Sequence, residues 1–420
     1  MLERIVKRTL KTIGLFSFCC SAYATETKLI QEQTAQSAPD IEWQRNFGGK
    51  FDDWANAVQQ TKDGGYIVAG QTISSEAGNR DVYLIKTDIN GDIKENKGWE
   101  KTFGGAGDDY ANSVQQTKDE GYIVAGATES FKFKFPDAYL IKTDSKGEKM
   151  WEKTFGGNFN DWARSVQQTK DDGYVVAGYT NSFKDGNGDI YLIRIDSSGN
   201  KVWENSFGNI GYDDAYSVQQ TSDDGFLVAG ATGIFGTKVW DVYLAKANSI
   251  GEKQWSKIFG GKGDDQAHSI EQTRDGGYIV AGDTDSFRAG GYDMYLIRID
   301  YNGNKLWRGE RMFGRSKDDH AYSVQQTSDG GFIIAGRTES FGSGDSDIYL
   351  VKTNSLGERL WEKIIGYKGD DWANAVQQTK DGGYIVAGGT KSLGSGDSDV
   401  YLIKLAPEKT SHPTSIFSNH

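Results

Sequence analysis

Cysteine is almost absent from this 420-residue sequence. The 2 cysteines, Cys19 and Cys20, lie near the N-terminus, and neither follows a recognisable lipoprotein motif. Both fall inside a segment that we expect to be removed, so the rest of the chain has no thiol and no disulfide. Its stability must come from packing and from closure of the fold on itself.

Long apolar runs are also scarce. The uncharged stretch at residues 12–24 follows four basic residues and ends in Ala22-Tyr23-Ala24, the order of features in a secretory signal peptide. The stretch is too short to span a bilayer comfortably. We therefore expect cleavage near Ala24-Thr25, a secreted or periplasmic protein, and no stable membrane insertion.

Positive charge is in short supply, because the formal net charge is −12. An acidic surface repels phosphate, which excludes nucleic acid as a good partner and disfavours anionic membranes. The sequence also lacks a Gly-x-Ser-x-Gly nucleophile elbow and a phosphate-binding loop. These absences argue against the enzyme classes that depend on those motifs.

Glycine, in contrast, is abundant, with 54 glycines against 4 prolines. The stretch DGGYIVAG at residues 63–70 recurs six more times in similar form. With the copies aligned on Val58, the intervals between equivalent residues are 56, 52, 52, 52, 54 and 52. Seven copies with four strand signals each predict an all-β fold, a seven-bladed β-propeller with four antiparallel strands per blade.

The pattern within one copy predicts the order of its strands. Residues 55–61 carry small side chains at alternate positions, as expected for an innermost strand where blades wedge together. Residues 66–69 and 82–85 are apolar without alternation, which indicates strands buried on both faces. Residues 99–103 alternate aromatic and polar side chains and suit a half-exposed outer strand.

The ends of the array predict how the ring closes. The array begins with an outer-strand segment at residues 41–49 and ends with a third strand at residues 399–405, so we expect the N-terminal strand to join the last blade. Tight glycine turns share one face, and the longer, variable loops form the opposite, working face. The expected segments are a signal peptide at 1–24, a flexible spacer at 25–40, blades at about 50–105, 106–157, 158–209, 210–261, 262–315, 316–366 and 367–405, and a disordered tail at 406–420.

The repeat unit, DGGYIVAGxT followed by DxYLIKTDxxG and then Trp, resembles the propeller repeat of many bacterial and archaeal exported and cell-surface proteins. The resemblance covers residues 41–405. More distantly, residues 139–151 are similar to the tyrosine-to-tryptophan repeat of quinoprotein dehydrogenases, and kelch-type propellers share the glycine pair. Quinoproteins usually have eight blades and, in many, a vicinal disulfide at the cofactor. This chain has neither, so we expect no quinone and no other cofactor.

Aspartates are the most regular polar residues in the repeats. The aspartate five positions before Val58 and the one that opens the third strand, Asp53 and Asp81 in the first copy, occur in all seven copies. A catalytic site is needed once, so we predict that these aspartates cap turns and loops. The same reasoning assigns the seven periodic tryptophans to the core.

Function is expected where the copies differ. Four and two positions before Val58 and its equivalents, the side chains vary and would ring the mouth of the central channel. Aromatic, amide and imidazole groups there could stack on and hydrogen-bond a polar ligand. The predicted ligand-binding residues are Trp54, Tyr110, Trp162, Arg164, Asp214, Tyr216, His268, His320, Tyr322 and Trp372. The alternative is that these aromatics plug a water-filled channel.

Two further features suggest metals. His268 and His320, with Asp264 and Asp318 nearby, could hold a metal, but their spacing matches no known site, and we expect solvated loop histidines. Residues 185–189 start like a calcium loop, with Asp185, Asn187 and Asp189 as oxygen ligands, but no bidentate glutamate follows. Calcium is the one metal that this pattern leaves open.

The sequence thus predicts a monomeric, non-enzymatic binding module that recognises a glycan, a peptide or a surface protein through its variable face. The alternative is a hydrolase, a lyase or a quinoprotein-like dehydrogenase with its site at the channel mouth. Its candidate residues would be His268, His320, Arg164 and Asp214.

Overall fold

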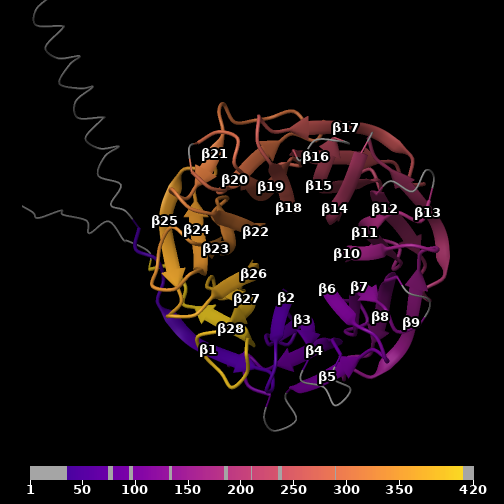
Figure 1. Cartoon of the computed structure of the whole chain (residues 1–420), viewed down its shortest axis with the longest axis horizontal. Coiled ribbons are helices and arrows are strands. Elements are labelled where there is room, and N and C mark those ends of the chain that lie inside the picture. Colours follow the sequence, from indigo (N-terminus) through magenta and orange to yellow (C-terminus); the bar gives the residue numbers. More distant parts are fainter. Residues whose placement is uncertain are drawn as a thin grey trace, which may run out of the picture. The chain divides into compact units, whose positions relative to one another are not determined.

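The computed structural model describes residues 36–73, 79–93, 98–131, 135–183, 188–209, 211–234, 239–288 and 290–409. The chain divides into the units Met1–Ala38 and Pro39–His420, and all 28 strands lie in the second. They form seven four-stranded sheets arranged as blades around one axis (Figure 1). Within the described ranges, no helix is long and apolar enough to cross a membrane. The predicted signal peptide, and most of the predicted spacer and tail, lie outside the described residues.

The first strand of each blade is innermost, as predicted. First strands of consecutive blades contact one another around the whole ring, and β26 closes against β2 (Figure 1). Each carries a fully buried alanine, such as Ala55, which lets neighbouring blades approach closely near the axis. In order from blade 1 to blade 7 these strands are β2 (Asp53–Gln60), β6 (Asp109–Gln116), β10 (Asp161–Gln168), β14 (Gly211–Gln220), β18 (Asp265–Gln272), β22 (Asp319–Gln326) and β26 (Asp371–Gln378).

The second and third strands form the core and are buried almost without a break, which confirms the prediction from their continuous apolar runs. The second strands are β3 (Tyr66–Thr72), β7 (Tyr122–Thr128), β11 (Tyr174–Thr180), β15 (Phe226–Ile234), β19 (Tyr278–Thr284), β23 (Phe332–Thr338) and β27 (Tyr384–Thr390). The third strands are β4 (Asp81–Thr87), β8 (Asp137–Thr143), β12 (Asp189–Ile195), β16 (Trp240–Ala247), β20 (Asp293–Ile299), β24 (Asp347–Thr353) and β28 (Asp399–Leu405).

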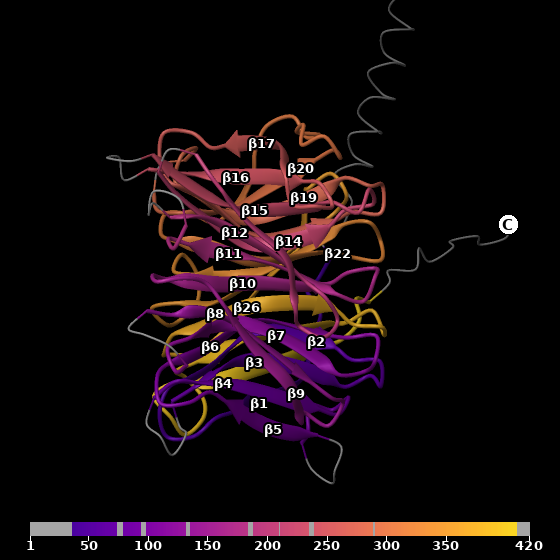
Figure 2. The same cartoon turned by 90° about the vertical axis from the view of Figure 1, so that its right-hand side faces the viewer.

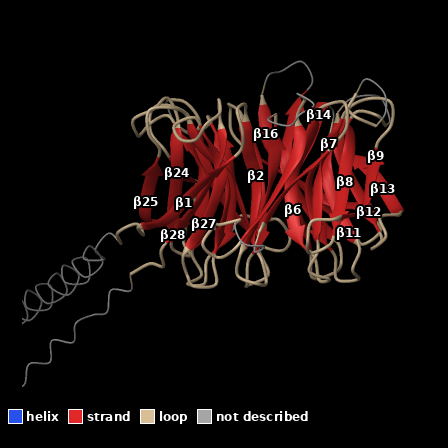
Figure 3. Cartoon of the chain, turned by 90° about the horizontal axis from the view of Figure 1, so that it is seen from below, coloured by secondary structure: helices blue, strands red, loops and turns tan. Residues whose placement is uncertain are grey.

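The outer strands are half-exposed, and the N-terminal one closes the ring. β1 pairs antiparallel with β28, with Phe47 opposite Val400, so the predicted closure is confirmed. In the side views the strands span the thickness of the ring and the loops form its two faces (Figure 2, Figure 3). The outer strands are β5 (Trp99–Phe103), β9 (Lys149–Phe155), β13 (Lys201–Phe207), β17 (Lys253–Phe259), β21 (Arg311–Phe313), β25 (Arg359–Ile365) and β1 (Ile41–Phe47).

The repeated tryptophans join consecutive blades at the rim of the core. Trp99, for example, packs edge-on against Tyr122 of the next blade, with 5.8 Å between ring centroids. The turn glycine Gly147 lies against the same tryptophan, and a Cβ there would come within 2.7 Å of the ring. This contact, together with its positive φ of 78°, explains why the turn requires glycine.

A cation on each third strand, buried in every blade but the fifth, explains why the Asp-Gly-Gly and Tyr-Leu-Ile-Lys motifs recur together. Lys352 is fully buried, and its Nζ lies 2.7 Å from Asp329 Oδ2 in the turn between the first two strands. The same ammonium donates to the carbonyl of Thr353 at 3.0 Å. Equivalent pairs involve Lys86, Lys142, Arg194, Lys246, Arg298 and Lys404.

The aspartates that open the innermost strands cap loops, as predicted. Asp53 is fully buried and accepts a hydrogen bond from the backbone N–H of Gly49 at 2.7 Å. All seven equivalents accept a backbone N–H four residues earlier in the chain at 2.7–2.9 Å. Their repetition therefore reflects the loop structure of each blade and not seven catalytic sites.

Candidate functional site at the channel mouth

Every innermost strand has a β-bulge at the same place. In blade 1, Ala55 pairs with Gly70 and Ala57 pairs with Ala69, which leaves Asn56 unpaired. A bulge re-aims the side chain of its extra residue. The bulged residues are the variable residues two positions before Val58 and its equivalents, namely Asn56, Asn112, Arg164, Tyr216, His268, Tyr322 and Asn374.

The glycine opposite each bulge explains a second fixed position of the repeat. A Cβ on Gly70 would lie 1.9 Å from the carbonyl oxygen of Trp54, so only glycine fits there. Simple alternation of side chains along the innermost strand is what the sequence pattern predicts. The bulge interrupts that alternation just where the site is built.

The bulged asparagines of blades 7, 1 and 2 clamp the ring. The Nδ2 of each donates a 2.8 Å hydrogen bond to the carbonyl of the buried alanine in the next blade: Asn374 to Ala55, Asn56 to Ala111, and Asn112 to Ala163. In blades 3 to 6 the bulged residues are charged or aromatic, and they make other contacts. The ring mouth is therefore chemically asymmetric although the backbone repeats.

In blades 3 and 4 an arginine side chain is surrounded by a carboxylate and two aromatic rings. Arg164 Nη2 lies 3.3 Å from Asp214 Oδ2. Its guanidinium also lies 5.0 Å from the ring centroid of Trp162 and 5.6 Å from that of Tyr216. Burial raises the pKa of Asp214, and Arg164 acts against that effect. Tyr110 extends the cluster through its ring contact with Trp162 at 5.2 Å.

In blades 5 and 6 two histidines share one carboxylate. Asp283 Oδ2 lies 2.8 Å from His268 Nε2 and 2.9 Å from His320 Nδ1. Asp283 Oδ1 accepts the backbone N–H of Ala321 at 2.9 Å. Burial alone would raise the pKa of Asp283, but the two imidazoles hold it well below its ordinary value. The carboxylate thus fixes the orientation of both imidazole rings.

This arrangement corrects the sequence-based view of the two histidines. They lie in β18 and β22 rather than in loops, and their side chains are only 16% and 12% exposed. Their partner is Asp283 and not Asp264 or Asp318, because the register of the blade brings Asp283 on β19 opposite Gln266 of β18. Where the structure describes the chain, no group of three or more His, Cys, Asp or Glu is arranged to hold a metal.

The predicted calcium loop lies mostly outside the described residues. Asp185 and Asn187 are among the residues that the structure does not describe. Asp189 begins β12 and is buried.

Asp283 belongs to a ring of variable residues that the sequence argument missed. In every blade, the residue before the last threonine of the second strand pairs with the variable residue four positions before Val58 or its equivalent. This residue is the x of the Ala-Gly-x-Thr motif, and it differs in most copies. The positions are Gln71, Ala127, Tyr179, Ala231, Asp283, Arg337 and Gly389.

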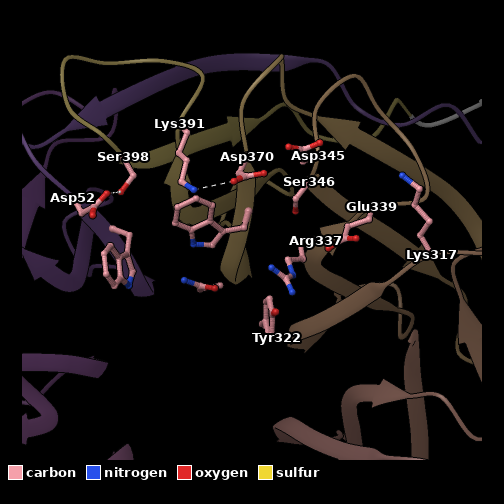
Figure 4. Close-up of a pocket in the computed structure, with 13 residues that line it drawn as sticks. Asp52, Lys317, Tyr322, Arg337, Glu339, Asp345, Ser346, Asp370, Lys391 and Ser398 are labelled. Atoms are coloured by element: carbon pink, nitrogen blue, oxygen red, sulfur yellow. Dashed lines mark hydrogen bonds and ion pairs between the residues drawn. The ribbon is translucent and has the colours of Figure 1, made fainter. Parts of the chain in front are cut away.

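Blades 6, 7 and 1 line an open cavity of about 810 Å³ on the face with the longer loops (Figure 4). Three of its charged groups already have a partner in the protein, since Lys391 lies 2.9 Å from Asp370 and Asp52 accepts a hydrogen bond from the hydroxyl of Ser398 at 2.8 Å. The lining consists of Asp52, Trp54, Lys317, Tyr322, Arg337, Glu339, Asp345, Ser346, Asp370, Trp372, Asn374, Lys391 and Ser398. Three of the ten predicted ligand-binding residues, Trp54, Tyr322 and Trp372, are among them.

Tyr322 connects the cavity to the histidine pair. Its ring is parallel to that of His320 at 5.9 Å and edge-on to that of His268 at 5.4 Å. Tyr216 contacts His268 at 5.1 Å, so the chain of contacts continues to the Arg164 cluster. Of the predicted set, all but Trp54 and Trp372 therefore form one contact network along blades 2 to 6, and those two tryptophans lie in the cavity beside it.

The other end of the channel carries a ring of glutamines with one exception. The first glutamine of the Val-Gln-Gln motif accepts the backbone N–H of the second glutamine in the next blade, in five blades at 2.5–2.6 Å. In blade 5 this residue is Glu271, which accepts the same bond from Gln326. Burial raises the pKa of Glu271 to about 7.

Comparisons with known proteins agree with the fold. A family model described as "Domain of unknown function (DUF5122) beta-propeller" matches residues 170–201. The chain is 23% identical over 282 residues to "Regulatory protein FlaEY" of Caulobacter vibrioides, a match that covers 59% of this chain and 29% of that protein. The chain thus spans less than a third of the length of this relative.

Solved structures of different activity share the architecture. A fungal alcohol oxidase of the AA5 family, in complex with copper, has a TM-score of 0.54 and 12% identity, covering 88% of this chain and 76% of the oxidase. The WD40 domain of Neurospora crassa Pan2 has a TM-score of 0.52 and 11% identity, covering 84% and 90%. At these identities the likeness shows the β-propeller fold alone, so function has to be argued from the site.

Proposed function

We propose that this protein is an exported binding module that holds a glycan in the cavity between blades 6, 7 and 1. The observation that carries the proposal is the combination of Trp54, Trp372 and Tyr322 with an amide and charged groups around about 810 Å³. A volume of this size falls in the range of small-ligand sites, roughly 300–1,000 Å³. Aromatic rings provide flat apolar surfaces for sugar rings, while polar groups between them bind hydroxyls.

The lining favours a glycan over a peptide. Peptides usually bind as an added strand on a sheet edge or as an apolar helix in a hydrophobic groove. Seven of the cavity side chains are charged, which does not suit an apolar helix. Each innermost strand pairs with the second strand on one side only, and its other edge faces the channel beside the first strands of the neighbouring blades. An extended peptide would therefore have to enter the channel to pair with it. The N-terminal sequence resembles a signal peptide, which supports export to a compartment where glycans are accessible.

Two tryptophans at the same position of the repeat provide a matched test. Trp372 lines the cavity, whereas Trp162 packs against Arg164 outside it. In a glycan screen with the full chain, Trp372→Ala is expected to weaken binding about 10-fold or more, and Trp162→Ala is expected to have little effect. Equal losses in both variants, or none in Trp372→Ala at an unchanged melting temperature, would contradict the proposal.

The histidine pair supports a second candidate, an acid–base enzyme. A carboxylate that orients an imidazole is a common arrangement for a general base, and Asp283 orients both His268 and His320. If the protein is an enzyme, His320→Ala should abolish turnover of the bound glycan while leaving its affinity within a few-fold. If His320→Ala turns the glycan over like wild type, or if wild type does not convert it at all, the binding module alone remains.

A further inference from the structure

The cavity contains one guanidinium without an acidic partner. Arg337 lies on β23, and its side chain sits beside that of Tyr322 at the edge of the cavity (Figure 4). Among the described residues no carboxylate oxygen lies within 4.0 Å of its nitrogens, and its Nε is buried without a hydrogen-bond partner. Burial raises the pKa of Tyr322 to about 12, and the positive charge of Arg337 acts in the opposite direction, which is consistent with their proximity.

Two of the other cations nearby are neutralised, whereas Lys317, which also lines the cavity, forms no ion pair with the described residues but is exposed to solvent. Lys391 in the same cavity forms an ion pair with Asp370 at 2.9 Å. Arg164, the arginine of the neighbouring network, is paired with Asp214 and lies between two aromatic rings. Arg337 therefore differs from both in having its charge uncompensated by the protein.

An uncompensated, partly buried cation is costly, and a bound anion removes that cost. The guanidinium presents its N–H donors in a plane that matches two oxygens of a carboxylate or a sulfate. Arg337 shares the cavity with Trp372 and Asn374. A sugar ring stacked on Trp372 would thus have its polar edge close to two kinds of hydrogen-bond donor, the guanidinium of Arg337 and the side-chain amide of Asn374.

We propose that Arg337 binds the anionic group of an acidic sugar, a uronate carboxylate or a sulfate ester, within the glycan held by the cavity. This inference rests on the proposed glycan-binding function. Glu339 and Asp345 also line the cavity and form no ion pair with the described residues (Figure 4). Their charges repel further anions, so the preferred ligand carries one acidic sugar among neutral ones and is not a polyanion.

The test compares matched glycans on the full chain by calorimetric titration. Each series has four ligands with the same sugar backbone. One is neutral, one carries a single uronate, one carries a single sulfate, and one is fully sulfated. We expect the singly acidic member to bind best. Arg337→Gln should weaken that member about 10- to 100-fold and leave the neutral member nearly unchanged. The uronate and sulfate arms distinguish the two sources of the anion.

Two further variants control for folding and for simple charge. Arg337→Lys keeps the charge but not the planar pair of donors, so it should recover only part of the affinity. Lys149→Met removes a cation that is paired with Glu152 on the outer strand β9, outside the cavity, and it should change the affinity less than about 3-fold. Equal binding of neutral and acidic members, or unchanged acidic binding in Arg337→Gln, would overturn the role of Arg337 while glycan binding stands. Binding of acidic peptides but of no glycan would overturn both proposals.

Discussion

Glu271→Gln tests whether burial controls the ionisation of the one carboxyl group in the glutamine ring at the turn-side end of the channel. The substitution gives blade 5 the residue that the other six blades already have, so no steric change is expected. The folded-state pKa of Glu271 is about 7, against an ordinary value of 4.5. The folded protein therefore binds this proton more tightly than the unfolded chain does, and stability from this group falls as the pH rises between these two values.

The size of the effect follows from that difference. About 2.5 pH units correspond to about 3 kcal/mol at 1.36 kcal/mol per unit. Because the side chain is partly exposed to the channel, we expect about 2 kcal/mol. Glu271→Gln should thus raise the free energy of unfolding by about this amount at pH 8 and change it little near pH 4. Urea titrations of the full chain at several pH values measure this difference directly.

The reverse substitution in another blade is a matched control. Gln115→Glu places a carboxylate at the equivalent position of blade 2, where Gln115 accepts the backbone N–H of Gln168 at 2.6 Å. It should destabilise the protein above pH 7 and not near pH 4. If the gain in Glu271→Gln is the same at all pH values, or if it is absent at pH 8, then burial does not control the ionisation of Glu271.

Three other substitutions probe features that recur in the ring. Asp329→Ala leaves the buried ammonium of Lys352 without its carboxylate and is expected to cost about 3 kcal/mol in urea unfolding, with Asp329→Asn intermediate. Asp283→Asn should lower the free energy of unfolding by about 3 kcal/mol at pH 6 and by less at pH 3. The pKa of this carboxyl is depressed in the folded protein, so the stability it provides is lost as the pH falls below the ordinary pKa of an aspartate. An equal loss at both pH values would refute this. Gly336→Ala places a Cβ 1.8 Å from the carbonyl oxygen of His320 and should cost about 3 kcal/mol by thermal and urea unfolding, whereas a fully stable variant would mean that the bulge tolerates a side chain.

The fold could be predicted because each of its features leaves a local pattern that is repeated. Seven copies of DGGYIVAG give the blade count, and continuous apolar runs give the buried strands. The outer-strand segment at residues 41–49 and the missing fourth strand after residue 405 predict the closure that the pairing of β1 with β28 confirms.

The site could be predicted only in part. The variable residues of the innermost strands were found because they differ between copies at positions near the axis. The bulge was missed because it depends on the pairing register, which cannot be read from the identity of any one side chain. The glycine opposite the bulge, which is present in all copies, was the indirect signal for it. Asp283 and Arg337 were missed because they lie on strands that the apolar pattern assigns to the core, and the varying x of Ala-Gly-x-Thr was the signal for them.

The cavity between blades 6, 7 and 1 is the proposed place where the protein binds its ligand. The most direct measurement is a crystal structure of the protein with a bound oligosaccharide from the screen. We predict density for a sugar ring against Trp54 or Trp372, with an anionic group about 3 Å from the guanidinium of Arg337. Density at the Arg164 cluster or on the outer strands, with the cavity empty, would contradict the claim.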